Sequence, residues 1–131
     1  MNTSAKKDIE TRNDIYLIVS CFYEKVKTEK TLGPIFNTII KNWDEHINTL
    51  TDFWETNLLC VSKYKGNPIK KHKIVNTAFN SSITVYHFGI WLQIWFQTID
   101  ALYSGEKAET AKRRARKMST HLLIKMHASQ K

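Results

Sequence analysis

An all-α domain is the fold class that the sequence predicts, and three observations support it. Apolar residues recur at helical spacing along four long segments. Gly and Pro are scarce, with four and two residues, which favours helices over many tight turns. No strand-like alternation, hairpin dipeptide or internal repeat occurs. A chain of 131 residues with 42% hydrophobic residues is expected to form one domain, residues 1–131, with a core of its own.

The first helix is expected to begin at Asn13, a side chain suited to a helix N-cap, and to run to about Lys30. Residues 1–12, which precede it, are expected to form a flexible N-terminal extension. Gly33-Pro34 cannot continue a helix, and Pro34 suits the start of a short new turn. The apolar face of the first helix consists of Ile15, Val19, Phe22 and Val26.

A second long helix is expected to begin near Asn42 or Trp43, and its apolar face is wide because two stripes overlap on it. Residues 62–82 are expected to form a loop with at most a short helix around residues 69–75, and this loop is long for an idle connection. The two stripes consist of Trp43, Ile47, Leu50, Trp54 and Leu58, and of His46, Leu50, Phe53 and Asn57.

A third helix is expected from about Thr84 to Tyr103, where Ser104-Gly105 ends it. The last helix is expected over residues 106–128 and is amphipathic. The residues expected to face inward are Phe88, Trp91, Trp95, Ile99 and Leu102 on the third helix, and Ala111, Ala115, Met118, Leu122 and Met126 on the last. The outer face of the last helix is expected to carry Lys112, Arg113, Arg116 and Lys117.

The formal net charge is +8, and residues 106–131 hold eight Lys or Arg against two Glu. Such a balance is compatible with nucleic acid, an anionic surface or an anionic ligand as partner. The N-terminus lacks the apolar region of a secretory leader, and the longest apolar stretch, residues 87–103, falls short of the roughly 20 residues that span a bilayer. Cys21 and Cys60 lie apart in apolar surroundings and are expected to be buried free thiols. We therefore expect a cytoplasmic protein with no membrane partner.

Conventional catalytic motifs are absent from the sequence, which has no Walker loop and no GxGxxG, HExxH or GxSxG pattern. Its five histidines include no pair at i, i+3 or i+4 on one helix, so a polynuclear metal site is not expected. Chemistry based on a single histidine remains, and haem is its main case. The porphyrin supplies four nitrogens, so the protein need give only one axial imidazole and a flat apolar slot.

Five fragments of the sequence resemble those of one family, in the same order and with similar gaps. They are CFYEKV followed by LGPIF, then WDEHINTLTDFW, YKGNPIKKH and IWLQIWFQTIDALY, and the resemblance as a whole runs from about residue 13 to residue 126. The family is that of the bacterial group III (P group) truncated haemoglobins. The resemblance implies a truncated globin fold, a 2-on-2 helical sandwich around haem b, which is iron protoporphyrin IX. The spacer between His72 and Trp91 is a few residues longer than the family's usual one.

Carried over residue by residue, the resemblance makes His72 the proximal ligand of the haem iron. Tyr23, His46 and Trp91 match the family's distal tyrosine, distal-helix histidine and tryptophan, and are expected to stabilise a bound ligand by donating hydrogen bonds. The resemblance leaves a second role open for His46, that of a gate at the mouth of the pocket. The apolar positions that line the family's pocket are matched by Phe22, Phe36, Leu50 and Phe53.

Further contacts with haem are expected from residues on either side of His72. Tyr64, Lys71 and Val75 are the candidates, and Lys70, Lys71, Lys73 or the hydroxyl of Tyr64 would pair with the two propionates. Exposed pairs of this kind add little energy.

The resemblance implies that the protein binds dioxygen, NO or CO at a five-coordinate haem iron. A polar pocket retains dioxygen, which suits reactive oxygen or nitric oxide chemistry better than transport. Nitric oxide dioxygenase or peroxidase-like activity would fit, and either needs an external reductase because the chain has no flavin domain. We expect a monomer that binds neither nucleic acid nor membrane.

Two other function classes compete with the haem interpretation. A basic all-α nucleic-acid-binding module would use the last helix for phosphate contacts, yet the aromatic residues are expected to face inward rather than to alternate with basic ones. A plain helical adaptor would leave Tyr23, His46, His72 and Trp91 unexplained as a set. Without the resemblance, these four residues would be assigned to core or surface packing.

Overall fold

The computed structural model describes residues 6–59 and 84–128 of the chain, with the side chains of the last helix described as far as Ile124 except for Leu123. Five α-helices occupy these ranges, and no strand occurs in them. The expected loop over residues 62–82 lies outside the described residues. The helices are α1 (Arg12–Thr28), α2 (Gly33–Ile39), α3 (Trp43–Leu59), α5 (Val85–Leu102) and α6 (Glu106–Ala128).

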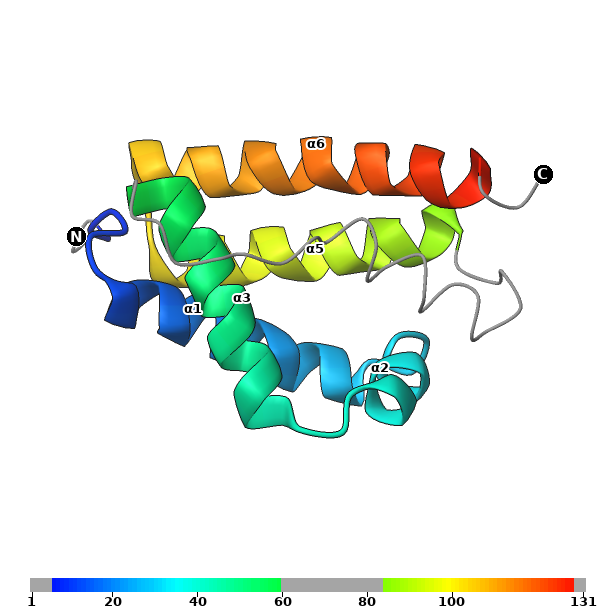
Figure 1. Cartoon of the computed structure of the whole chain (residues 1–131). Helices are drawn as coiled ribbons and strands as arrows, with labels where there is room; N and C mark the ends of the chain where they lie inside the picture. The colour runs from blue at the N-terminus through cyan, green and yellow to red at the C-terminus, as the bar shows by residue number, and fades with distance from the viewer. Residues whose placement is uncertain (1–5, 60–83, 129–131) are drawn as a thin grey trace.

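The helices are arranged in two crossed pairs, α1 with α3 and α5 with α6 (Figure 1). α5 and α6 run antiparallel along each other, and α1 packs against α5 while α3 crosses α1 and reaches α6. α2 is a short helix beside the end of α1. Arg12 ties the first turn of α1 to α3, since its guanidinium donates to Asp52 Oδ1 at 2.6 Å and to Glu55 Oε1 at 2.8 Å. The predicted all-α fold is confirmed, and the two crossed pairs agree with the expected 2-on-2 arrangement.

The helix ends follow from capping side chains rather than from apolar periodicity alone. Thr11, and not Asn13, caps α1, because its hydroxyl accepts from the Asp14 N–H and the Asp14 carboxylate accepts from the Thr11 N–H. Thr84 and His87 form the same reciprocal pair at the start of α5. The predicted helix ends agree with the structure to within two residues wherever the structure describes them.

The core lies where α1, α3, α5 and α6 meet. Phe22 on α1 is 1% exposed and lies edge-on to Trp95 on α5, at a centroid distance of 5.1 Å. Trp95 stacks on Trp54 of α3 at 4.9 Å and on Trp91 at 6.3 Å, so three indoles form one stack. Its Nε1 donates to the Ala111 carbonyl at 3.2 Å. Small side chains on α6 allow α5 to pack against its backbone. They are Ala108, Ala111 and Ala115, all of which are buried.

The N-terminal segment, residues 6–11, differs from the flexible extension that the sequence analysis expected. Ile9 is 1% exposed, and the Asp8 carboxylate accepts from the N–H groups of Lys107 and Ala108 at 2.8 and 2.9 Å. Asp8 thus satisfies the first turn of α6 from a hundred residues away. Gly105 precedes this turn with a φ of +146°, a conformation that favours glycine.

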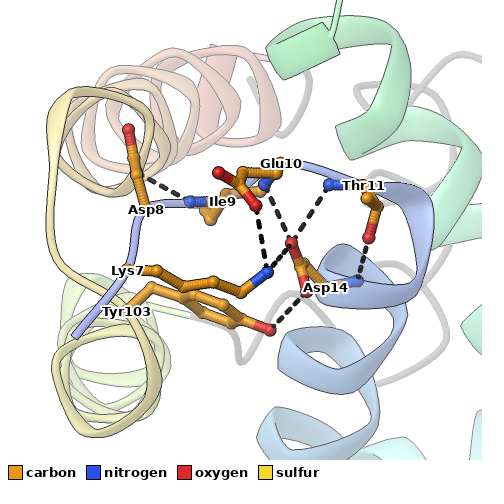
Figure 2. A network of polar contacts seen from close by, with 7 residues as sticks. All are labelled: Lys7, Asp8, Ile9, Glu10, Thr11, Asp14 and Tyr103. Carbon is orange, nitrogen blue, oxygen red and sulfur yellow. Dashed lines mark hydrogen bonds and ion pairs between the residues drawn. The ribbon is translucent and has the colours of Figure 1, made fainter.

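A second set of contacts ties this segment to α1 and α5 (Figure 2). The Asp14 carboxylate accepts from Lys7 Nζ at 3.0 Å, from the Glu10 N–H at 2.9 Å and from the Tyr103 hydroxyl at 3.0 Å. Burial alone would raise the pKa of this carboxyl, but the four donors, the Thr11 N–H included, outweigh burial and lower it to about 2. Burial and the hydrogen bond to Asp14 raise the pKa of Tyr103 to about 12.

Several predicted burial patterns are confirmed and others are wrong. Arg113, Arg116 and Lys117 are exposed on α6 as expected, but Lys112 is half-buried and pairs with Asp100 and Glu109 at 2.7 and 2.8 Å. Leu102 and Cys21 are half-buried rather than buried, because each lies at the edge of its helix's inner face. Cys60 and the Met126 side chain lie outside what the structure describes. Among the helices that the structure describes, none is long and apolar enough to cross a membrane.

Candidate functional site

Aromatic side chains from three helices meet where α1, α2 and α3 come together. Tyr23 of α1 lies at the centre of this cluster, with ring centroids 5.0 Å from His46, 5.5 Å from Trp43 and 6.2 Å from Phe36. His46 and Trp43 lie one turn apart on α3 and are themselves 5.9 Å apart. The cluster brings two polar side chains, a phenol and an imidazole, together among apolar rings.

The hydroxyl of Tyr23 is buried and joined by a hydrogen bond to Trp91 of α5. Because an indole can only donate, the Tyr23 oxygen is the acceptor, and its own proton remains available for another acceptor. Burial raises the pKa of Tyr23 well above its usual range, and the hydrogen bond from Trp91 offsets only part of that rise. Tyr23 is therefore a neutral phenol at any physiological pH.

Half-buried apolar side chains of α3 and α2 lie beside this polar cluster. Leu50, Phe53 and Phe36 are half-buried and pack against the core from its edge, with Phe53 edge-on to Trp54 at 5.2 Å. Phe22 lies deeper, behind Tyr23 and Trp91, at centroid distances of 4.8 and 5.5 Å. Half-buried apolar side chains next to buried hydrogen-bond donors are typical of a site for a largely apolar ligand.

Comparison with known proteins identifies the family. No protein-family model matches the chain. The chain is 32% identical over 114 residues to the group 3 truncated hemoglobin ctb of Campylobacter jejuni, a match that covers 84% of this chain and 86% of that protein. The chain belongs to the group III truncated haemoglobins. This truncated haemoglobin also resembles the crystal structure of a group III truncated hemoglobin from Campylobacter jejuni, with a TM-score of 0.82 and 30% identity over 92% of this chain and 94% of that one.

Membership of the family makes the chain a globin of the haem-binding class and does not favour the nucleic-acid-binding alternative. The inward position of most of the described aromatic rings agrees with this, since stacking on bases requires exposed rings. His121 is exposed on α6.

The structure of this truncated haemoglobin brings together three of the predicted distal residues, Tyr23, His46 and Trp91. His46 points inward, because its half-buried ring lies edge-on to that of Tyr23. Four other predicted site residues lie outside the described residues: His72, Tyr64, Lys71 and Val75.

Trp43 is a site residue that the sequence analysis placed only in the apolar stripe of its helix. Its ring contacts those of Tyr23 and His46, and Lys27 Nζ lies over it, 4.6 Å from the centroid. Helical spacing carried part of the signal, because Trp43 precedes His46 by three residues and so shares its face. The contacts with α1 depend on how two helices cross, which spacing within one helix does not determine.

The residues present fit a haem group. A porphyrin is planar and apolar over most of its surface, and the half-buried side chains of Phe36, Leu50 and Phe53 offer it flat apolar contacts. A ligand bound to its iron needs a hydrogen-bond donor in a water-poor setting, and the buried Tyr23 hydroxyl, supported by Trp91, is a donor of this kind.

Proposed function

We propose that the chain holds haem b through His72 and binds dioxygen, NO or CO beside Tyr23, His46 and Trp91. The observation that carries the proposal is the buried phenol of Tyr23, which accepts a hydrogen bond from Trp91 and lies against His46. Haem supplies an iron atom with one open coordination position, where a diatomic ligand binds and gains partial negative charge.

The distal residues act as a short chain of donors. The Trp91 N–H donates to the Tyr23 oxygen, which polarises the phenol and strengthens the hydrogen bond that its own proton can make. Because burial keeps Tyr23 protonated, this proton is present throughout the physiological pH range. His46 supplies a third polar group at the same place, as a donor in one tautomer or as a side chain that swings aside.

The energy of these bonds favours retention of dioxygen over its transport. Each charge-assisted hydrogen bond contributes about 1.5–3 kcal/mol, so two of them, from Tyr23 and His46, would slow ligand release by several orders of magnitude. With haem in place, the same donors would favour nitric oxide dioxygenase or peroxidase-like chemistry, because they would stabilise negative charge that develops on oxygen. Either reaction requires electrons from an external reductase. We propose that the protein is a cytoplasmic monomer that accepts them.

The haem edge completes the proposal. Tyr64, Lys71 and Val75 are assigned to contacts around His72, with Lys71 or Tyr64 at the propionates. Phe22, Phe36, Leu50 and Phe53 are assigned to the apolar lining, for which the half-buried positions of the last three provide support.

The experiment that tests the proposal is the absorption spectrum of the protein and of its His72→Ala variant. We expect a Soret band in the purified or hemin-treated protein, with ferrous and CO spectra typical of an axial histidine. The variant should lose haem or shift its ferrous spectrum, and imidazole added to the solution should restore the original spectrum. His121→Ala is a matched control, because this histidine is exposed on α6.

A colourless protein that gives no Soret band with hemin would contradict the haem proposal. A His72→Ala variant with an unchanged ferrous spectrum would move the iron ligand to another residue.

A further inference from the structure

Trp43 lies at the junction of α1 and α3, where it contacts two of the distal residues at once. Its ring is 5.5 Å from that of Tyr23 at an interplanar angle of 55°, and 5.9 Å from that of His46 at 88°. Tyr23 comes from α1 and His46 from α3, so Trp43 contacts the distal residues of both helices. Trp43 itself is half-buried.

Lys27 holds this indole from α1. Its ammonium group lies over the Trp43 ring at 4.6 Å from the centroid and forms an ion pair with Glu24 at 3.2 Å. Lys27 follows Tyr23 by four residues, so the cation and the phenol share one face of α1 and reach the same indole.

The backbone of Lys27 is itself fixed by α2. The Asn37 side chain donates to its carbonyl at 3.1 Å, and a methyl group added at Gly33 would lie 2.5 Å from that oxygen. The cation is therefore presented from a well-defined position rather than from a freely moving helix end.

We propose that Trp43 is a positioning residue that holds the Tyr23 and His46 side chains in their donor orientations, and that Lys27 keeps Trp43 in place. The inference rests on the proposed function, because it assigns Tyr23 and His46 to ligand stabilisation. Trp43 donates no hydrogen bond to the bound ligand in this scheme. It restricts the rotamers of two donors, and donors already oriented stabilise developing charge without a cost of reorientation.

Four variants distinguish a positioning role of Trp43 from a role in core packing alone. Trp43→Leu removes the aromatic contacts with both rings, whereas Trp43→Phe keeps a ring at the same place. Lys27→Met keeps the aliphatic stem and removes the charge over the indole. Lys25→Met is the matched control, because Lys25 is an exposed cation on the same helix with no aromatic ring beneath it among the described contacts.

The measurement is the C–O stretching spectrum of the ferrous CO complex, which reports polar contacts on the bound ligand. We expect Trp43→Leu to gain a band from CO that no donor contacts, while Trp43→Phe and Lys25→Met retain the original spectrum. Lys27→Met should change the ratio of the bands by about two- to five-fold, the effect of losing an exposed cation–π contact.

A second readout does not depend on ligand chemistry. Nuclear Overhauser effects between the Tyr23 and His46 rings, recorded on the protein as purified, should be present in the unmodified chain and weaken in Trp43→Leu. Trp43→Leu with unchanged C–O bands and unchanged ring contacts would overturn the inference. If Trp43→Leu does not fold, Lys27→Met tests the inference instead. An unchanged ratio of C–O bands together with unchanged ring contacts in Lys27→Met would overturn the inference.

The two proposals fail differently. Absence of a Soret band contradicts the proposed function, and the contacts between the two rings still test Trp43 in that case. A normal Soret band with spectra that are insensitive to Trp43 and Lys27 contradicts the positioning role alone.

Discussion

At the scale of single residues, the site depends on a phenol kept neutral and oriented by its neighbours. Tyr23 is buried on α1, accepts a hydrogen bond from Trp91 and has Trp43, Phe36 and His46 around its ring. A phenol in water would exchange its partners freely, whereas here the surrounding rings leave few rotamers open. Its single proton can therefore be aimed at one place.

Replacing Tyr23 by Phe removes this proton and leaves the Trp91 N–H without its acceptor. We expect the oxygen dissociation rate to rise about ten- to one-hundred-fold, the equivalent of one charge-assisted hydrogen bond. Stopped-flow mixing of the oxygenated protein with excess CO measures the rate. Tyr16→Phe is the control, because Tyr16 lies on the same helix and is 41% exposed. Equal rates for Tyr23→Phe and the unmodified protein would show that Tyr23 does not donate to the ligand.

At the scale of helices, the sequence predicted the elements well and their junctions poorly. Periodicity placed α1, α3, α5 and α6 because each has an apolar stripe that must be buried. The resemblance placed Tyr23, His46 and Trp91 together, which spacing alone could not have done. The role of Trp43 in the cluster was not predicted, because its contacts cross from α3 to α1. The contacts of Asp8 and Ile9 were not predicted, because a short irregular segment has no period and the partners of Asp8 lie a hundred residues away.

The junction between the N-terminal segment and α6 allows a direct test with two glycines. A methyl group at Gly105 would lie 2.5 Å from Asp8 Cγ, and the φ of +146° is unfavourable for alanine. We expect Gly105→Ala to lower the free energy of unfolding by more than about 1 kcal/mol. Gly89→Ala should raise it by about 0.5–1 kcal/mol, because Gly89 lies within α5 and a methyl group there meets nothing within 4 Å. Urea unfolding of both variants measures this, and equal effects would contradict the close approach of Asp8.

At the scale of the whole molecule, the two crossed helix pairs are tied together at their ends by polar contacts. Arg12 joins α1 to α3, Asp8 joins the N-terminal segment to α6, and Asp14 joins that segment to Tyr103 at the end of α5. The aromatic cluster around Tyr23 lies where α1 and α3 meet α2 (Figure 1). The polar ties and the aromatic cluster around Tyr23 are thus separate, so we expect substitutions in one to have little effect on the other.

These ties predict how stability depends on pH. The pKa of Asp14 falls from 3.8 to about 2 on folding, so its stabilisation is complete above pH 4 and is lost as the pH falls toward 2. The loss amounts to about 1–2 kcal/mol after allowance for solvent screening. At the alkaline end, the raised pKa values of Tyr23 and Tyr103 mean that folding keeps both phenols protonated, so stability declines as the pH rises above 10.

Urea unfolding at pH 7, 4 and 2.5 measures this dependence. Asp14→Asn should lower the free energy of unfolding at pH 7 and show a smaller difference from the unmodified protein at pH 2.5. Glu10→Gln is the control, because the Glu10 side chain is 65% exposed and its ion pair with Lys7 contributes little. A difference for Asp14→Asn that stays constant from pH 7 to 2.5 would contradict the lowered pKa.

The tryptophan stack has an optical consequence. Trp54, Trp95 and Trp91 lie ring on ring at 4.9 and 6.3 Å, and Trp43 completes the four tryptophans of the chain at the distal cluster. Stacked indoles couple their electronic transitions, which produces near-ultraviolet circular dichroism that depends on α3 packing against α5. Haem bound at the proposed site would quench their emission by energy transfer. The four tryptophans would thus report both helix packing and cofactor loading, and both can be followed without any added label.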